Sequence, residues 1–197
     1  MTRLILSALL AMLLAWLPVT VFAGISSVEH PDRMAVGLTR PQQLSLDGEW
    51  RFQKDPDEVG ESEHWYQPGK INERTVRVPL PWQLADQELI PYRGTAWYER
   101  EVTIPSNYVG KRIAACFYGV DDSAKVWING QYVGEHTGAQ APFLLDISAA
   151  AKPGQENVIT VKVTDPPGGT SFFMDTHSLI GVSGIWRGVW IEATGES

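Results

Sequence analysis

Cysteine is almost absent from this 197-residue chain, in which Cys116 is the only one. A single cysteine excludes a disulfide within the chain, so packing has to hold the fold together. Cys116 lies in the apolar run 113–118. Free cysteines in such runs usually behave as small hydrophobic side chains. We therefore expect Cys116 to be buried and unreactive.

Positive charge and histidine are also scarce. The chain has 16 Lys and Arg residues against 23 Asp and Glu, a net charge of −7, and no basic cluster. Such a surface repels phosphate backbones, so nucleic acid is not an expected partner. The histidines, His30, His64, His136 and His177, lack the spacing of zinc ligands, and zinc is not expected either. We interpret His136 as a structural residue that makes a local hydrogen bond.

Helical periodicity is nearly missing after residue 23, whereas Trp, Tyr, Val and Ile are frequent and Gly and Pro recur between them. This composition predicts an all-β fold. Residues 46–53 and 159–164 alternate between apolar and polar positions, which is the period of a half-buried strand. Short antiparallel strands of this kind favour a two-sheet sandwich. Further strands are expected at 75–78, 97–104, 111–118, 124–128, 131–133, 143–146 and 184–192.

The pair Asn129-Gly130 separates the expected strands 124–128 and 131–133. A two-residue type I′ turn needs a positive φ at both central positions, and Asn-Gly is its preferred sequence. We therefore predict a tight hairpin at this point. The long connections 55–74, 79–94 and 165–182 carry no strand pattern. Binding groups usually lie on such loops.

The one long apolar run, residues 4–22, follows Arg3 and precedes the small residue Ala23. This pattern predicts a helical signal peptide at 1–23, cleaved after Ala23, and therefore an exported, periplasmic or secreted protein. The run is also near the lower length limit of a membrane-spanning helix, so retention as a membrane anchor is the alternative. We expect residues 24–43 to form a lead-in and residues 44–193 to form a single domain.

Several short motifs follow one another along residues 44–193. They are Asp47-Gly48-Glu49-Trp50-Arg51-Phe52, Val78-Pro79-Leu80-Pro81-Trp82, Gly94-Thr95-Ala96-Trp97-Tyr98, Gly119-Val120-Asp121, the 126–134 hairpin, His136-Thr137-Gly138 with Pro142-Phe143, and Gly184-Ile185-Trp186-Arg187. Together they resemble the N-terminal sugar-binding domain of glycoside hydrolase family 2, the group that contains β-galactosidases, β-glucuronidases and β-mannosidases. This resemblance implies a galactose-binding-like jelly-roll β-sandwich.

The resemblance implies recognition of carbohydrate rather than cleavage. In that family the two catalytic carboxylates lie in a TIM barrel that follows an immunoglobulin-like domain, and we expect neither domain in this chain. The Asn72-Glu73 pair looks like the family's acid/base dipeptide, but it lies in a polar loop. Three interpretations remain: an exported carbohydrate-binding protein, a fragment of a split or truncated glycosidase that needs a separate glycosidase chain, and a protein-interaction module without sugar binding.

The resemblance also points to a sugar-binding loop. Residues 171–175, Ser-Phe-Phe-Met-Asp, resemble a β-glucuronidase loop whose acidic residue reaches a sugar hydroxyl, so Asp175 is the matching carboxylate. The segment after Asp175 is longer than that loop and carries His177, a second candidate. A solvated loop acid is the alternative for Asp175. In the loop 79–94, Tyr92 and Arg93 are candidates to line a sugar site, with loop decoration as the alternative.

Sugars present apolar C–H faces, which pack on exposed aromatic rings. Trp127 shares a face of its strand with Lys125 and is either half-covered by a neighbouring loop or available to a ligand. We assign Trp50, Trp97 and Trp190 to the core, because their strands bury at least one face.

No cofactor is expected. A structural Ca²⁺ is the alternative, because jelly rolls of this kind hold such a cation through loop carboxylates. The acidic pairs that would serve are Asp121-Asp122 and the segment 55–58. Acidic loop clusters are more often hydrated surface.

Overall fold

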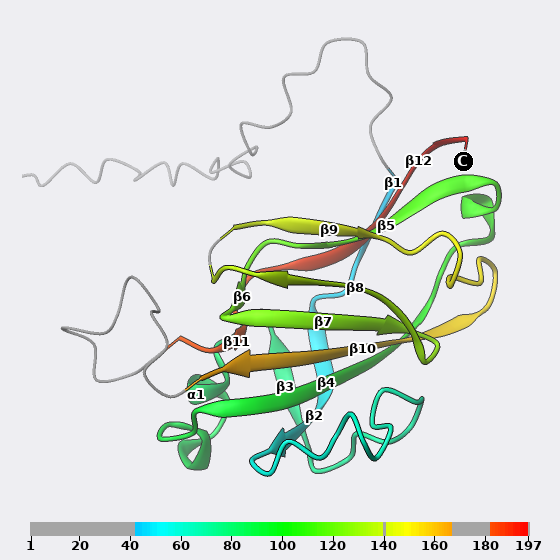
Figure 1. Cartoon of the computed structure of the whole chain (residues 1–197). Helices are drawn as coiled ribbons and strands as arrows, with labels where there is room; N and C mark the ends of the chain where they lie inside the picture. The colour runs from blue at the N-terminus through cyan, green and yellow to red at the C-terminus, as the bar shows by residue number, and fades with distance from the viewer. Residues whose placement is uncertain (1–41, 140, 167–181, 197) are drawn as a thin grey trace, which may run out of the picture. The chain divides into compact units, whose positions relative to one another are not determined.

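The strands of this chain form two large antiparallel sheets and one small one (Figure 1). A computed structural model describes residues 42–139, 141–166 and 182–196, all within the compact unit Thr39–Ser197. The predicted signal peptide and nearly all of the predicted lead-in lie outside the described residues.

The larger sheet has six strands in the order β3-β2-β4-β10-β7-β8, and every neighbouring pair is antiparallel. Each strand contributes one face to the core and one to the outside, as the alternating sequence requires. The strands are β2 (Gly48–Asp55), β3 (Arg74–Val78), β4 (Gly94–Thr103), β7 (Ser123–Ile128), β8 (Gln131–Thr137) and β10 (Glu156–Asp165).

The second sheet has four strands in the order β1-β12-β5-β9, and a two-stranded sheet pairs β11 with β6. Short helices lie in the connections. The strands are β1 (Gln42–Ser45), β5 (Lys111–Phe117), β6 (Val120–Asp121), β9 (Phe143–Asp146), β11 (Gly184–Ile185) and β12 (Val189–Glu196). The helices are α1 (Trp82–Ala85) and the 3-10 helices η2 (Gln87–Leu89) and η3 (Ser106–Tyr108).

One hydrophobic core joins the inward faces of the two large sheets. Trp50 and Phe52 of β2 pack with Tyr98 of β4, and Phe117 and Ile191 enter the same core from the four-stranded sheet. Aromatic rings dominate this interior because each buries a large apolar area. The described residues therefore form an all-β sandwich, as the sequence predicted.

The predicted hairpin is confirmed. Asn129 has φ 54° and Gly130 has φ 79°, the two positive values that a type I′ turn requires. The Asn129 side chain also ties the turn to its surroundings, because its Nδ2 donates to the Ala150 carbonyl at 2.9 Å and its Oδ1 accepts from the Val158 amide at 3.0 Å.

The predicted strand 184–192 is wrong as a single element. β11 ends at Ile185 and pairs with β6, whereas β12 begins at Val189 and pairs with β1 and β5. The chain changes sheets between them. Local alternation does not reveal such a change, because both pieces keep the β period.

Trp50 and Trp190 were both predicted to be core residues, but only Trp50 is. Trp50 is fully buried in the shared core, as predicted. Trp190 is only half-buried. Its neighbours Val189 and Ile191 occupy the inward positions of β12, so Trp190 points to the outer face. There the centroid of its ring lies 4.4 Å from that of Tyr118. The assignment of Trp190 to the core was therefore wrong. Cys116, its partner on β5, is buried as predicted, and burial raises the pKa of its thiol to about 12.

Candidate functional site

The candidate site begins where β10 ends and β11 starts. Asp165 is the last residue of β10, and Ser183 immediately precedes β11. The Ser183 hydroxyl donates to the Asp165 carboxylate, and Gln83 of α1 holds Ser183 twice: its Nε2 donates to the Ser183 Oγ at 2.5 Å, and its Oε1 accepts from the Ser183 amide at 3.0 Å. All three side chains are buried. We call Gln83, Asp165 and Ser183 the stem network.

Arg93 lies against this network. Its Nε is 3.5 Å from Asp165 Oδ2, and its Nη1 donates to the Tyr92 carbonyl at 2.8 Å. About a third of the side chain, 34%, is exposed. The guanidinium is thus fixed at the base of the segment that carries Asp175 and His177, with part of its surface open to solvent. Asp175 and His177 themselves lie outside the described residues.

The Tyr92 side chain makes its contacts within the protein. Its hydroxyl donates to the Thr95 carbonyl, and its ring lies 5.7 Å from the ring of Trp82, which is fully buried. Burial raises the pKa of the Tyr92 hydroxyl to about 12, so it stays protonated at neutral pH. The structure therefore places Arg93 against Asp165, whereas the Tyr92 hydroxyl is committed to an internal bond with the Thr95 carbonyl.

Trp127 lies elsewhere, on the outer face of the six-stranded sheet. Its ring stacks on Trp97 at 5.2 Å and on Tyr66 at 5.5 Å, and only 5% of the residue is exposed. Tyr66 belongs to residues 56–73, which we call the covering loop. Of the two alternatives for Trp127, coverage by a loop is the one observed. Trp127 has no free ring face for a ligand here, so it does not join Arg93 in one site.

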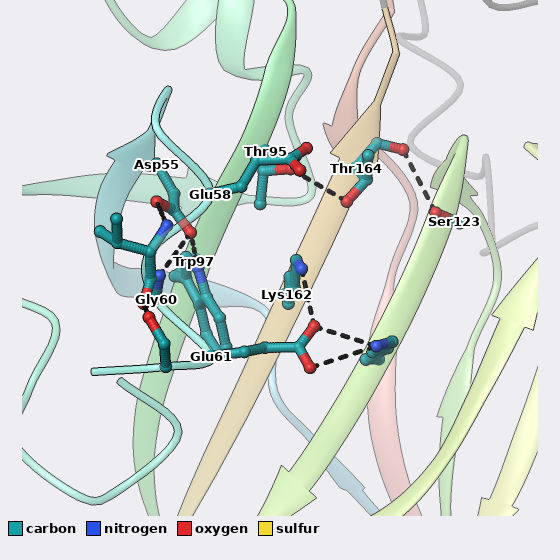
Figure 2. A network of polar contacts seen from close by, with 12 residues as sticks. Asp55, Glu58, Gly60, Glu61, Thr95, Trp97, Ser123, Lys162 and Thr164 are labelled. Atoms are coloured by element: carbon teal, nitrogen blue, oxygen red, sulfur yellow. Dashed lines mark hydrogen bonds and ion pairs between the residues drawn. The ribbon is translucent and has the colours of Figure 1, made fainter. Parts of the chain in front are cut away.

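Carboxylates fasten the covering loop to the sheet (Figure 2). Asp55, at the end of β2, accepts hydrogen bonds from the amides of Val59 and Gly60 at 2.8 and 3.0 Å and from the Trp97 indole at 2.9 Å. Figure 2 shows these three bonds converging on one carboxylate. Trp97 is therefore buried as predicted, but it belongs to a second apolar cluster under the loop.

Further along the loop, Glu61 lies between two lysines. Its carboxylate is 2.7 Å from the ammonium of Lys162 and 2.9 Å from that of Lys125 (Figure 2). The bond to Lys162 chiefly, with help from Lys125, holds the pKa of Glu61 below its ordinary value. The loop therefore reaches across β10 to β7.

A third carboxylate, that of Glu99, is fully buried under the loop. It accepts from the Gly69 amide at 2.9 Å and lies 3.0 Å from the guanidinium of Arg51. Burial raises the pKa of Glu99 in spite of these partners. No local pattern in the sequence predicts this contact, because Glu99 is followed by two further charged residues, Arg100 and Glu101, in the same strand.

A row of hydroxyl groups crosses the sheet at the same end as Arg93. The Thr95 and Thr164 hydroxyls are 3.2 Å apart, and Thr95 also donates to Glu58 at 3.3 Å. Ser123 of β7 donates to the Thr164 carbonyl at 3.4 Å (Figure 2). Neither the stem network nor these residues were among the binding residues predicted from the sequence. The alternation of Thr164 with apolar neighbours marked it as outward-facing, but nothing marked its partners.

Metal binding has little geometric support in the described part of the chain. No group of three or more His, Cys, Asp or Glu residues there is placed to hold an ion. In the calcium candidate 55–58, both carboxylate oxygens of Asp55 already accept N–H donors. His136 stacks on Phe143 with ring centroids 4.4 Å apart, which fits a structural role.

Comparison with known proteins identifies the family to which this fold belongs. The model of the family described as "Glycosyl hydrolases family 2, sugar binding domain" matches residues 44–194. A β-glucuronidase from Paenibacillus borealis is 35% identical over 150 residues, which cover 70% of this chain and 24% of that protein. A β-galactosidase from Thermoanaerobacter pseudethanolicus is 38% identical over 108 residues, or 51% of this chain and 14% of that protein.

Among solved structures, β-glucuronidase from Ruminococcus gnavus in complex with D-glucuronic acid superposes with a TM-score of 0.68 at 30% identity, covering 78% of this chain and 30% of that one. The chain therefore spans less than a third of the length of these relatives. Within the described residues, no helix has the length and apolar character needed to cross a bilayer. The match over residues 44–194 shows that the chain belongs to glycosyl hydrolase family 2, through that family's sugar-binding domain.

Proposed function

We propose that this domain binds a saccharide at the loop end formed by the stem network, Arg93 and the segment that carries Asp175. The observation that carries the proposal is the match to a sugar-binding domain over 44–194, together with the convergence of Arg93, Asp165 and Ser183 at the two ends of that segment. We further propose that the sandwich is a galactose-binding-like jelly roll, because its strands form two large antiparallel sheets and residues 44–194 match a sugar-binding domain.

Asp175 would orient the sugar. An ionised carboxylate that accepts from hydroxyl groups makes short, charge-assisted hydrogen bonds and so fixes the position of a sugar ring. His177, two residues further on, would add a donor or acceptor at the same rim. Arg93 would contribute positive charge beside them, because its guanidinium is partly exposed at the base of the segment.

The role proposed here is recognition, with bond cleavage supplied by a catalytic region of the family 2 type. Retaining glycoside hydrolysis needs two carboxyl groups about 5–5.5 Å apart on either side of the scissile bond. Glu73 does not fit that task, because its carboxylate accepts from the Lys54 amide at 2.9 Å and pairs with Arg74 at 2.9 Å. Its contacts support the interpretation of Asn72-Glu73 as a chance resemblance.

A glucuronoside is the proposed ligand class. The support is indirect: several relatives are β-glucuronidases, and one structural neighbour was solved with D-glucuronic acid. Galactosides are the second candidate, because another relative is a β-galactosidase. A partly exposed arginine at the site favours the acidic sugar of the two.

Export and assembly are separate proposals. The apolar run 4–22 supports export to the periplasm or the exterior, and the mass of the purified mature protein would reveal cleavage after Ala23. The domain would act either as a free-standing binding protein or together with a separate glycosidase chain. Co-purification with a family 2 barrel protein would favour the second arrangement, and a stable complex with an unrelated protein would favour the interaction-module alternative.

Calorimetric titration of the purified mature chain with methyl β-D-glucuronide and methyl β-D-galactoside tests the sugar-binding proposal. We expect Asp175→Asn to lower the affinity about tenfold, the loss of one charge-assisted hydrogen bond, with an unchanged melting temperature. The matched control is Asp57→Asn, an exposed loop acid. Equal loss of affinity and melting temperature would make Asp175 structural, and absence of binding to both glycosides would contradict the proposal.

A further inference from the structure

We propose a second saccharide-binding surface on the outer face of the β7–β8 hairpin, specific for a neutral pyranose and independent of the loop-end site. We call Lys125, Tyr132 and Glu135 the hairpin surface. Tyr132 is its centre, because this large side chain is 50% exposed in a protein whose other described aromatic rings are mostly buried or half-buried.

A β-bulge determines which side chains of β8 lie on the hairpin surface. Trp127 pairs with Tyr132, but Val126 pairs with Gly134, so Val133 is an extra residue on β8. In a regular strand, Tyr132 and Glu135, three positions apart, would lie on opposite faces. The bulge at Val133 brings both to the outer face, with Glu135 opposite Lys125. Bulges often re-aim side chains in this way beside binding sites.

A rigid aromatic base supports Tyr132 from below. Its ring meets the edge of Trp127 at 5.7 Å, and Trp127 is itself stacked between Trp97 and Tyr66. A ring held in this way has little conformational freedom left to lose when a ligand binds, so contact with the apolar C–H face of a sugar costs little entropy. The covering loop therefore fills most of this face and leaves one supported ring at its edge.

Polar groups of both signs flank the ring. Lys125 is 39% exposed and pairs with Glu61, which also pairs with Lys162. Glu135 lies opposite Lys125 on the neighbouring strand. The two ammonium groups and two carboxylates cancel, so this surface attracts neither an acidic nor a basic sugar. Ammonium groups donate to sugar hydroxyls and carboxylates accept from them, which suits the polar rim of a neutral pyranose.

The hairpin surface is separate from the loop-end site along the strands. Tyr132 lies next to the turn that follows the last residue of β7. Asp165 is the last residue of β10, which runs antiparallel to β7 (Figure 1). The two residues therefore lie at opposite ends of these strands. The bonds described above for the stem network and Arg93 join residues at that far end. A saccharide on Tyr132 therefore needs no group from the loop end.

Titration of the mature chain with cellohexaose, mannohexaose and xylohexaose, followed by calorimetry and by saturation-transfer NMR, tests this surface. We expect one of these neutral oligosaccharides to bind, Tyr132→Ala to lower its affinity about tenfold, and Tyr132→Phe to retain it, because the ring supplies the contact. Glu135→Ala should weaken binding without affecting folding, since the residue is exposed.

The matched control is Leu144→Ala, an exposed apolar residue of the other large sheet, which should leave the affinity unchanged. Asp175→Asn should also leave it unchanged, which separates this surface from the proposed loop-end site. The proposal is overturned if none of the hexasaccharides binds, or if binding survives Tyr132→Ala and Glu135→Ala but is lost in Asp175→Asn.

Discussion

Single residues decide how closely the covering loop approaches the sheet, and Gly60 is the clearest case. Its amide donates to Asp55, and a Cβ atom at this position would lie 2.4 Å from Trp97 Nε1 and 2.7 Å from Asp55 Oδ2. No heavy atoms pack that closely without a shift of the structure. A glycine is therefore required where the loop crosses the buried indole.

We expect Gly60→Ala to lower the free energy of unfolding by about 1–3 kcal/mol, the usual cost of overpacking. Urea denaturation measures it. Gly188→Ala is the control, because a Cβ there would meet Asp47 at an ordinary 3.4 Å. Equal stability of the Gly60 variant and the wild type would show that the loop does not pack on Trp97 as described.

At the scale of elements, the covering loop and the six-stranded sheet are joined by carboxylates with opposite pH behaviour. Glu61 has a lowered pKa in the folded state, so its contribution to stability is present above the unfolded value, near 4.5, and is lost as the pH falls through the folded value. Glu99 has a raised pKa, so ionisation disfavours the folded state as the pH rises. A rise in pH therefore strengthens the contribution of Glu61 to stability and weakens that of Glu99.

Glu61→Gln should lower the melting temperature at pH 7, because the bonds to Lys162 and Lys125 lose their charge. The difference from the wild type should disappear in acid, below the folded pKa of Glu61, where the wild-type carboxyl is neutral too. Thermal scans from pH 7 to pH 3 provide the measurement. Glu156→Gln, an exposed residue at the start of β10, should show no such pH dependence. A difference that stays constant with pH would argue against the ion pairs.

At the scale of the whole sandwich, both large sheets share one core, so loss of a central side chain should weaken them together. Trp50 is buried between residues of both sheets, and its indole donates to the Leu46 carbonyl at 2.8 Å. Trp190 faces outward and packs on Tyr118. The two tryptophans therefore differ in what their removal exposes.

Trp50→Ala should cost about 3–5 kcal/mol, as for other buried aromatic residues, and unfolding should remain a single transition. Trp190→Ala is the matched comparison and should cost clearly less. Urea unfolding followed by far-ultraviolet circular dichroism gives both values. Two separate transitions, or equal losses in the two variants, would contradict a single shared core.

The sequence by itself determined the all-β class, most strand positions and the type I′ turn at Asn129-Gly130. These follow from alternation and from local φ preferences, which neighbouring residues set among themselves. The family motifs likewise identify the sugar-binding domain from the sequence alone. Tyr92 and Arg93 were placed correctly on a long loop, though their partners were not.

Only the tertiary structure decided which face each loop covers. Gln83 and Ser183 meet although they are 100 residues apart, and Tyr66 stacks on Trp127 from a loop that carries no strand pattern. The outward turn of Trp190 likewise depends on where the chain changes sheets. Alternation reports that a side chain lies on one face or the other. What packs on that face depends on contacts between distant residues, which a local pattern does not encode.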